Sequence, residues 1–161
     1  MDAELHYADE RHAIGSVGIV FVNVIRHPAT VEMIRETRRH VQRHFRRWEG
    51  RSVAMSVLEP SAAQAVPKEV RQESAALAGE FKSLAAATVV EGTGFRAAAV
   101  RTALASMFLI ARPSFPHKVF GDLSEGAGWV VATGSRAAPV GASSEDILRA
   151  VEVIRRALKS S

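Results

Sequence analysis

The stretch HAIGSVGIVFVNVI, residues 12–25, decides the fold class because it is almost wholly apolar and rich in β-branched side chains. Such an uninterrupted run is typical of a strand that is covered on both faces, as strands of parallel sheets are. We therefore expect one buried strand here, with a short strand at residues 4–9 before it in an antiparallel hairpin. His27 ends the run, and Pro28 suits the first turn of a following helix.

Outward from this stretch, buried-type strands alternate with segments of helical periodicity. The further strands are expected at residues 51–60, 83–92 and 117–120, and the helices at residues 28–48, 68–81 and 94–112. Strands that alternate with helices need right-handed crossovers, which favour parallel pairing. The sequence therefore predicts an α/β fold, with a mixed, mostly parallel sheet of about five strands and helices packed on it.

The C-terminal part adds two more helices. Asp122 or Ser124 can cap the first, which runs to about residue 133. Residues 134–142 have the composition of a linker. Ser143 and Asp146 then form a capping-box pattern that starts a helix within residues 143–161. We expect this helix to belong to the same structural unit as residues 1–133, since 161 residues suit a single domain.

Composition excludes several classes of function. The chain has no cysteine, which rules out disulfides, a thiolate nucleophile and a cysteine-ligated metal. Its first residues are acidic and polar, unlike a secretory signal. The longest apolar run, residues 97–111, is interrupted by Arg101 and is shorter than the roughly 20 residues of a membrane-spanning helix. We therefore expect a cytoplasmic protein without a membrane span or a cofactor.

The positive charge of the chain is concentrated in one predicted helix, at RETRRHVQRHFRRWEGR, residues 35–51. Residues 35–47 hold six arginines and one acid, a net +5, while the other 15 Lys and Arg against 16 Asp and Glu give −1. Because several of these arginines are three or four residues apart, much of this charge lies on one helical face. The candidate anion- or partner-binding residues are Arg35, Arg39, Arg43, Arg46 and Arg47.

This face has several interpretations. It can dock an acidic protein, an anionic lipid surface or a nucleic acid, or it can simply be solvated. A protein partner is favoured over lipid and nucleic acid, because no exposed aromatic residues are interleaved with the arginines. His40 and His44 have the spacing of a helical zinc site, but Val41 replaces the glutamate of that motif and the neighbouring guanidiniums repel cations. No metal is expected.

Two further groups of residues are candidates for a site. Polar residues at the carboxyl ends of the strands could meet in a crevice for acid–base or metal chemistry, or could be ordinary caps and turns. They are His27, Glu59, Glu91 and Asp122. Arg101, inside the apolar helix, needs an acid or several carbonyls if it is buried. Alternatively Arg101, Ala105 and Phe108 border an apolar contact surface between copies or with a partner.

Residues 85–133 carry a resemblance to a known group. A strand AAATVVEGTGF leads to a helix RAAAVRTAL with an internal arginine, then to RPSFPHKVFGDLSEGAGWV, which ends on Trp129 and Val130. This order resembles the STAS-like domains, which include the bacterial anti-sigma-factor antagonists, and is most similar to a STAS/CRAL-TRIO-like subgroup of small bacterial proteins. The pattern covers about residues 4–133.

The resemblance implies a non-catalytic module that docks partners in signalling or regulation. It also implies a phosphorylated serine after the middle strand; the loop EPSAAQAVPKE lacks the Asp-Ser-Ser-Gly type of motif and offers Ser61 near that place. We thus expect a non-enzymatic interaction module, as a homodimer. CRAL-TRIO-like relatives imply the alternative, a small-molecule or lipid-binding module with a cavity between the helix at residues 95–111 and the sheet. An enzyme built on the strand-end residues is the third hypothesis.

Overall fold

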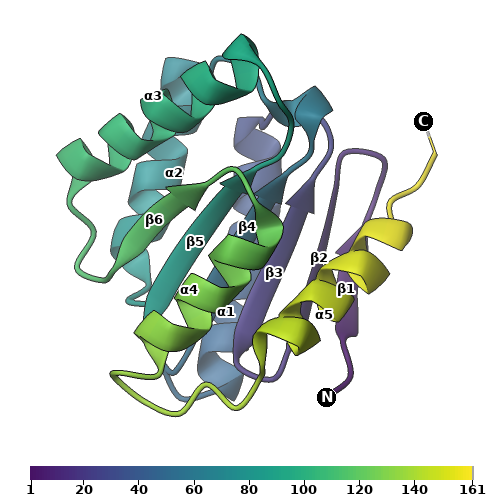
Figure 1. The fold of residues 1–161 in the computed structure, drawn as a ribbon, viewed down its shortest axis with the longest axis vertical. Coiled ribbons are helices and arrows are strands. Elements are labelled where there is room, and N and C mark those ends of the chain that lie inside the picture. The colour runs from purple at the N-terminus through teal and green to yellow at the C-terminus, as the bar shows by residue number, and fades with distance from the viewer. Residues whose placement is uncertain (161) are drawn as a thin grey trace.

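The computed structural model describes residues 1–160 and shows an α/β sandwich built on one six-stranded mixed sheet (Figure 1). The strands are β1 (Glu4–Ala8), β2 (His12–Val17), β3 (Val20–Ile25), β4 (Val53–Leu58), β5 (Ala85–Val90) and β6 (His117–Phe120). The helices are α1 (Val31–Arg47), the 3-10 turn η1 (Pro60–Ala62), α2 (Lys68–Glu80), α3 (Phe95–Ala111), α4 (Leu123–Gly134) and α5 (Ser144–Arg156). The predicted fold class is confirmed.

Strand order in the sheet follows the order in the chain, from β1 to β6. The β1–β2 and β2–β3 pairs are antiparallel, and β3, β4, β5 and β6 run parallel to one another. The opening antiparallel edge predicted from the sequence is therefore present. Within the described residues, no helix is both long enough and apolar enough to cross a lipid bilayer.

The prediction of a single long strand at residues 12–25 is wrong, because this stretch is a hairpin of β2 and β3. Val17 pairs with Val20, and only Gly18 and Ile19 form the turn between them. Gly18 has φ +55°, a conformation that glycine adopts without steric cost and that two-residue hairpins require at this position. The turn was missed because its second residue is apolar, so hydrophobicity does not fall where the chain reverses.

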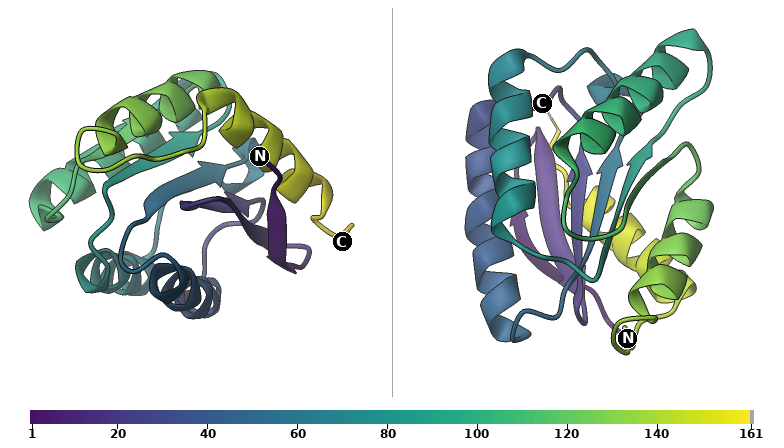
Figure 2. Two further views of the ribbon diagram at one scale, coloured as in Figure 1. Left: turned by 90° about the horizontal axis from the view of Figure 1, so that it is seen from below. Right: turned by 90° about the vertical axis from the view of Figure 1, so that its left-hand side faces the viewer.

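The helices form two layers on opposite faces of the sheet. Crossovers from β3 to β6 all step toward the same edge, which places α1, α2 and α3 on one side. Figure 2 shows α1 and α2 together under the sheet, α4 and α5 on the other face, and α3 beside the edge formed by β6. The helix α3 contacts β5 and β6, whereas α2 packs against α1.

Caps fix where the last two helices begin. The Asp122 side chain accepts a hydrogen bond from the Glu125 amide at 2.9 Å and starts α4. Ser143 and Asp146 form the predicted capping box at the start of α5. The α5 helix packs on β2, β3 and α4, so the segment from residue 143 shares the core of the rest of the chain. Ser161, the last residue of the predicted C-terminal segment, lies outside the described residues.

The main core lies between the sheet and the α4–α5 layer. Val53, Met55 and Val57 of β4 point into it and are fully buried. Gly126 of α4 permits close contact with the sheet, since a Cβ there would lie 2.8 Å from a methyl carbon of Val89. This face of the sheet is therefore closely packed.

The opposite face of β4 is different, and it is the feature that positions the candidate site. Ala54, Ser56 and Leu58 alternate with the buried residues and remain only half-buried, although β4 lies inside the sheet. An interior strand of a parallel sheet normally has both faces covered by helices. The layer of α1, α2 and α3 thus leaves a strip of the sheet incompletely covered.

Candidate functional site

An inner cavity of about 220 Å³ occupies this uncovered strip. Its floor consists of short side chains from the two middle parallel strands: Ala54, Ser56, Ala86 and Thr88. Longer apolar side chains from three helices and from Phe81, just after α2, form its walls: Ile34 and Val41 of α1, Val70 and Leu77 of α2, Phe81, and Leu104, Met107 and Phe108 of α3. The short floor residues do not reach the helices above them, and the space stays open.

An outer cavity of about 530 Å³ continues the inner one between α3 and the segment that precedes α2. Val66, Leu104 and Met107 line both cavities, so we treat them together as one groove. Small residues again create the space, since Ala99 and Ala103 of α3 face it. The groove lies between the helix Phe95–Ala111 and the sheet, where the sequence interpretation placed a possible ligand cavity.

Two arginines stand in the outer cavity. Arg71 of α2 and Arg96 of α3 are both exposed, and both line it. The Arg71 guanidinium donates from Nη1 to the Val66 carbonyl oxygen at 2.9 Å, which holds it beside the opening. No acidic side chain of the described chain lines either part of the groove. An anionic group is therefore the natural partner for this end.

The inner cavity holds a few polar groups and no full charge. Thr88 Oγ1 and His117 Nε2 are hydrogen-bonded at 3.0 Å, while the buried Nδ1 of His117 has no partner within the described residues. Burial lowers the pKa of His117 to about 4, so its ring is neutral at pH 7. Asn23 donates from Nδ2 to Thr37 Oγ1 at 3.4 Å, and its buried Oδ1 is left unpaired in the same part of the chain.

The predicted contact surface on α3 is divided between different environments. Arg101 donates from Nη1 to the carbonyl oxygens of Val90 and Gly92, at 3.1 and 3.4 Å, and so satisfies the end of β5 instead of pairing with an acid. Phe108 turns toward the groove and its ring centroid lies 3.6 Å from that of His117. Ala105 is exposed and lines neither cavity.

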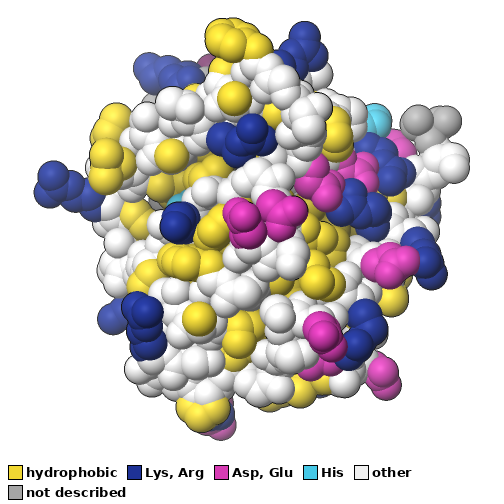
Figure 3. Space-filling view, in the orientation of Figure 1, with side chains coloured by type: hydrophobic (Ala, Val, Ile, Leu, Met, Phe, Trp, Pro, Cys, Tyr) yellow, Lys and Arg dark blue, Asp and Glu magenta, His cyan; other side chains and the backbone are white. Residues whose placement is uncertain are grey.

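The solvent side of α3 is apolar at both ends. Phe95 is 90% exposed, Leu109 77% and Ile110 82%. Figure 3 shows hydrophobic side chains at the surface over both ends of this helix, with Lys or Arg side chains close by. Large exposed apolar side chains on one element are typical of a contact or ligand-entry surface.

Most of the arginines on α1 are engaged within the molecule. Arg35 pairs with Glu73 at 3.5 Å, Arg39 pairs with Glu36, and Arg47 forms two hydrogen bonds to Glu4 at 2.7 and 3.1 Å. The side chains of Arg43 and Arg46 have no ion-pair or hydrogen-bond partner within residues 1–160. The predicted basic face is thus largely neutralised, and its free charge is confined to two residues.

The strand-end residues only partly come together. Glu59 and Glu91 meet at Arg155 of α5, whose Nη1 lies 2.8 Å from Glu59 Oε2 and 2.7 Å from Glu91 Oε1. Burial would raise the pKa of Glu59, but Arg26 and Arg155 outweigh it, so the pKa is lowered and the carboxylate is held ionised. Both acids therefore serve ion pairs.

The side chains of the other two predicted crevice residues take no part in these ion pairs. Asp122 caps α4, and the backbone amide of His27 donates to the Arg11 carbonyl oxygen at 3.2 Å. Within residues 1–160, no three side chains of the metal-ligating types gather at one place. The geometry found here is that of structural caps and bridges.

Ser61 is the middle residue of the 3-10 turn after β4 and is exposed. Its hydroxyl donates to the Arg26 carbonyl oxygen, which ties the end of β4 to the end of β3.

Comparisons of the chain with protein-family models, with curated proteins and with solved structures find no match.

Proposed function

We propose that this protein binds an elongated amphipathic molecule, with an apolar chain in the groove and an anionic end at Arg71 and Arg96. The observation that carries the proposal is the half-buried face of β4, where Ala54 and Ser56 lie inside the sheet without a helix packed on them. A sheet interior left open in this way loses the stabilisation of burial. A ligand that fills the groove would restore it.

The chemistry of the lining fits an apolar chain. The inner cavity is bounded by aliphatic and aromatic side chains with a few hydroxyl, amide and imidazole groups, a lining usual for small-molecule sites. The outer cavity, at about 530 Å³, falls within the roughly 300–1,000 Å³ range of such sites. A charged molecule would meet no counter-ion in the inner part, because His117 is neutral there.

The positive charge at the outer cavity indicates which polar group the proposed ligand carries. Arg71 and Arg96 offer planar guanidinium groups, which suit a carboxylate through paired hydrogen bonds. We therefore name a long-chain carboxylate as the ligand class. The resemblance to CRAL-TRIO-like domains implies an apolar ligand as well, and membership of the STAS-like group is part of this proposal.

Partner docking is the second candidate function. The exposed Phe95, Leu109 and Ile110 favour a contact through α3, as a homodimer or with another protein. Docking through α1 has less support, since its ion pairs occupy most of the arginines. Phosphorylation of Ser61 stays a prediction, as does a cytoplasmic location.

The groove is tested with a fluorescent probe, undecanoic acid carrying a dansyl group, titrated against the purified full chain. Ala103→Trp places an indole in the outer cavity, and Ala105→Trp adds the same group on the same helix outside the groove. We expect Ala103→Trp to weaken probe binding about tenfold or more and Ala105→Trp to leave it unchanged. Equal binding by both variants and the wild-type chain, with unchanged thermal unfolding, would overturn the proposal.

A further inference from the structure

A second pocket, separate from the groove, lies between α1 and β1. It measures about 50 Å³ and is lined by five side chains that carry or can carry positive charge: His6, His40, Arg43, His44 and Arg47. We call it the basic pocket. No acidic side chain of the described chain is among the residues that line it.

Two local features of the backbone assemble this pocket. Positions 40, 43, 44 and 47 follow the i, i+3, i+4, i+7 pattern and so share one face of α1. The β1–β2 register shifts between Leu5 and Tyr7, which leaves His6 at an irregular position in the strand. Bulges of this kind redirect a side chain. Here His6 is placed opposite the stripe on α1.

Most of the lining side chains are held in place by bonds within the molecule. His44 is buried and its Nε2 donates to the Ile19 carbonyl oxygen at 2.9 Å. The Nε2 atom of His6 lies 2.8 Å from Ser16 Oγ. Arg47 is fixed by its two bonds to Glu4. The pocket is therefore organised before any ligand arrives, which reduces the entropic cost of binding.

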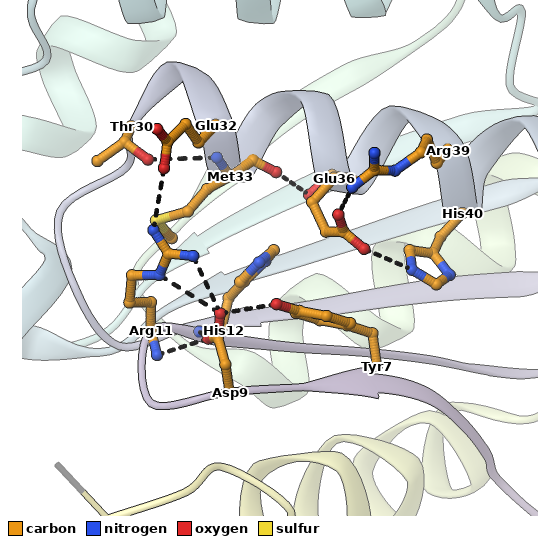
Figure 4. A network of polar contacts seen from close by, with 11 residues as sticks. Tyr7, Asp9, Arg11, His12, Thr30, Glu32, Met33, Glu36, Arg39 and His40 are labelled. Atoms are coloured by element: carbon orange, nitrogen blue, oxygen red, sulfur yellow. Dashed lines mark hydrogen bonds and ion pairs between the residues drawn. The ribbon is translucent and has the colours of Figure 1, made fainter.

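His40 is held by a carboxylate at one side of its ring. Its Nε2 lies 3.2 Å from Glu36 Oε1, and Arg39 pairs with the same carboxylate (Figure 4). The Tyr7 ring packs on the His40 ring with a centroid distance of 5.7 Å. The contact to Glu36 uses Nε2, and Nδ1 of His40 makes no hydrogen bond within residues 1–160.

Arg43 is the one lining residue without a partner in residues 1–160. Burial lowers the pKa of His40, and the positive charges of Arg43 and Arg39 lower it further. Burial is also the largest cause of the lowered pKa of His6. Glu4 and Glu36 stand at the edge of the pocket but are engaged by Arg47, Arg39 and His40. A positive potential therefore remains inside.

We propose that the basic pocket binds a tetrahedral oxyanion, namely phosphate or a phosphate monoester group. The Arg43 guanidinium supplies a full charge and a fork of N–H donors, and the free ring nitrogens of His6 and His40 supply further donors once they are protonated. The size of the pocket admits a single such group. The group can come from a soluble phosphate compound or from a phosphomonoester lipid headgroup.

Inorganic phosphate is the first probe, at constant ionic strength with chloride as the reference ion. Histidine Cε1 proton shifts are followed by NMR as a function of pH in the wild-type chain, Arg43→Gln and Arg46→Gln. Arg46 is equally unpaired and exposed on the same helix but does not line the pocket, which makes it the matched control. We expect phosphate to raise the pKa of His6 and His40, and Arg43→Gln to weaken binding about tenfold.

Vesicles identify the source of the group. Phosphatidylcholine vesicles with added phosphatidic acid should capture the wild-type chain and Arg46→Gln but not Arg43→Gln if a lipid headgroup is bound. Binding of free phosphate alone assigns the site to soluble compounds. The proposal is overturned if neither probe binds, or if both variants lose binding equally. Ala103→Trp in the groove should not alter phosphate binding, so the two proposals fail separately.

Discussion

Arg155 of α5 holds Glu91 through two parallel hydrogen bonds, from Nη1 to Oε1 at 2.7 Å and from Nη2 to Oε2 at 2.9 Å. The same guanidinium bonds Glu59, which Arg26 also contacts at 2.6 Å. This cluster joins the end of the last helix to the ends of β3, β4 and β5. Figure 3 shows acidic and basic side chains interleaved on this face of the molecule.

Arg155→Met should lower the free energy of unfolding by about 1–3 kcal/mol, because it leaves two partly buried carboxylates without their shared partner. Arg156→Met is the matched control. Arg156 pairs with Glu152 on the solvent side of the same helix, and its loss should change stability by less than about 0.5 kcal/mol. Urea unfolding of both variants measures the difference, and similar losses would contradict the structural role of the cluster.

Arg96→Gln should weaken binding of oleate about two- to fivefold while leaving oleyl alcohol unaffected, because only the carboxylate gains from the guanidinium. Arg112→Gln, at the far end of α3 and outside the groove, should affect neither ligand. Displacement of the dansyl-labelled acid measures both affinities. Equal losses of affinity for the acid and the alcohol would mean that Arg96 shapes the groove but does not interact with the carboxylate of the ligand.

Stability should decrease as the pH falls from 7 to 4. Burial lowers the folded-state pKa of His12 and of His117, the latter to about 4, so the unfolded chain takes up these protons first. Their contribution is complete above the unfolded pKa of roughly 6.5 and is lost between there and the folded value. For His117 the loss is on the order of 3 kcal/mol.

His12 offers a direct check of this effect. Its ring is fully buried beside Tyr7, and neither ring nitrogen has a partner in the described residues (Figure 4). His12→Leu places an apolar side chain at this buried position and removes the uptake of a proton by residue 12 in the unfolded chain. Urea midpoints of this variant should depend less on pH between 4 and 6.5 than those of the wild-type chain. An unchanged pH dependence would exclude His12 as a source.

Two glycines of α4 should respond to alanine in opposite directions. Gly126→Ala brings a methyl group to 2.8 Å from Val89 and should destabilise the fold by about 1–3 kcal/mol. Gly128→Ala meets no atom within 4 Å and should stabilise the helix by about 0.5–1 kcal/mol. Thermal unfolding separates the two, and equal effects would mean that α4 does not lie against β5 as closely as described.

The fold class followed from the sequence because its two periodicities are distinct over long segments. The error at Gly18 and Ile19 has a physical origin, since a tight turn between two buried strands needs one permissive residue and no polar one. Helix starts at Asp122 and Ser143 were predictable because capping is local chemistry within a few residues.

The groove depended on information that periodicity does not contain. The strand VAMSVL alternates larger residues with Ala54 and Ser56, and this alternation is the signal of the groove in the sequence. Whether small residues face a cavity or a closely packed helix depends on the placement of α3, a tertiary property. The basic pocket is similar, because α1 supplies a visible stripe while His6 arrives from a bulge in β1.

The uneven covering of the sheet also affects how often each helix opens locally. The helix α2 buries only Val70, whereas α5 buries Ile147, Ala150, Val151 and Ile154. Elements with few buried contacts open at lower free-energy cost, and their amide hydrogens exchange with solvent sooner. We therefore expect α2, a wall of the groove, to open more often than α5. The frequency of that opening would limit how fast the proposed ligand enters and leaves the groove.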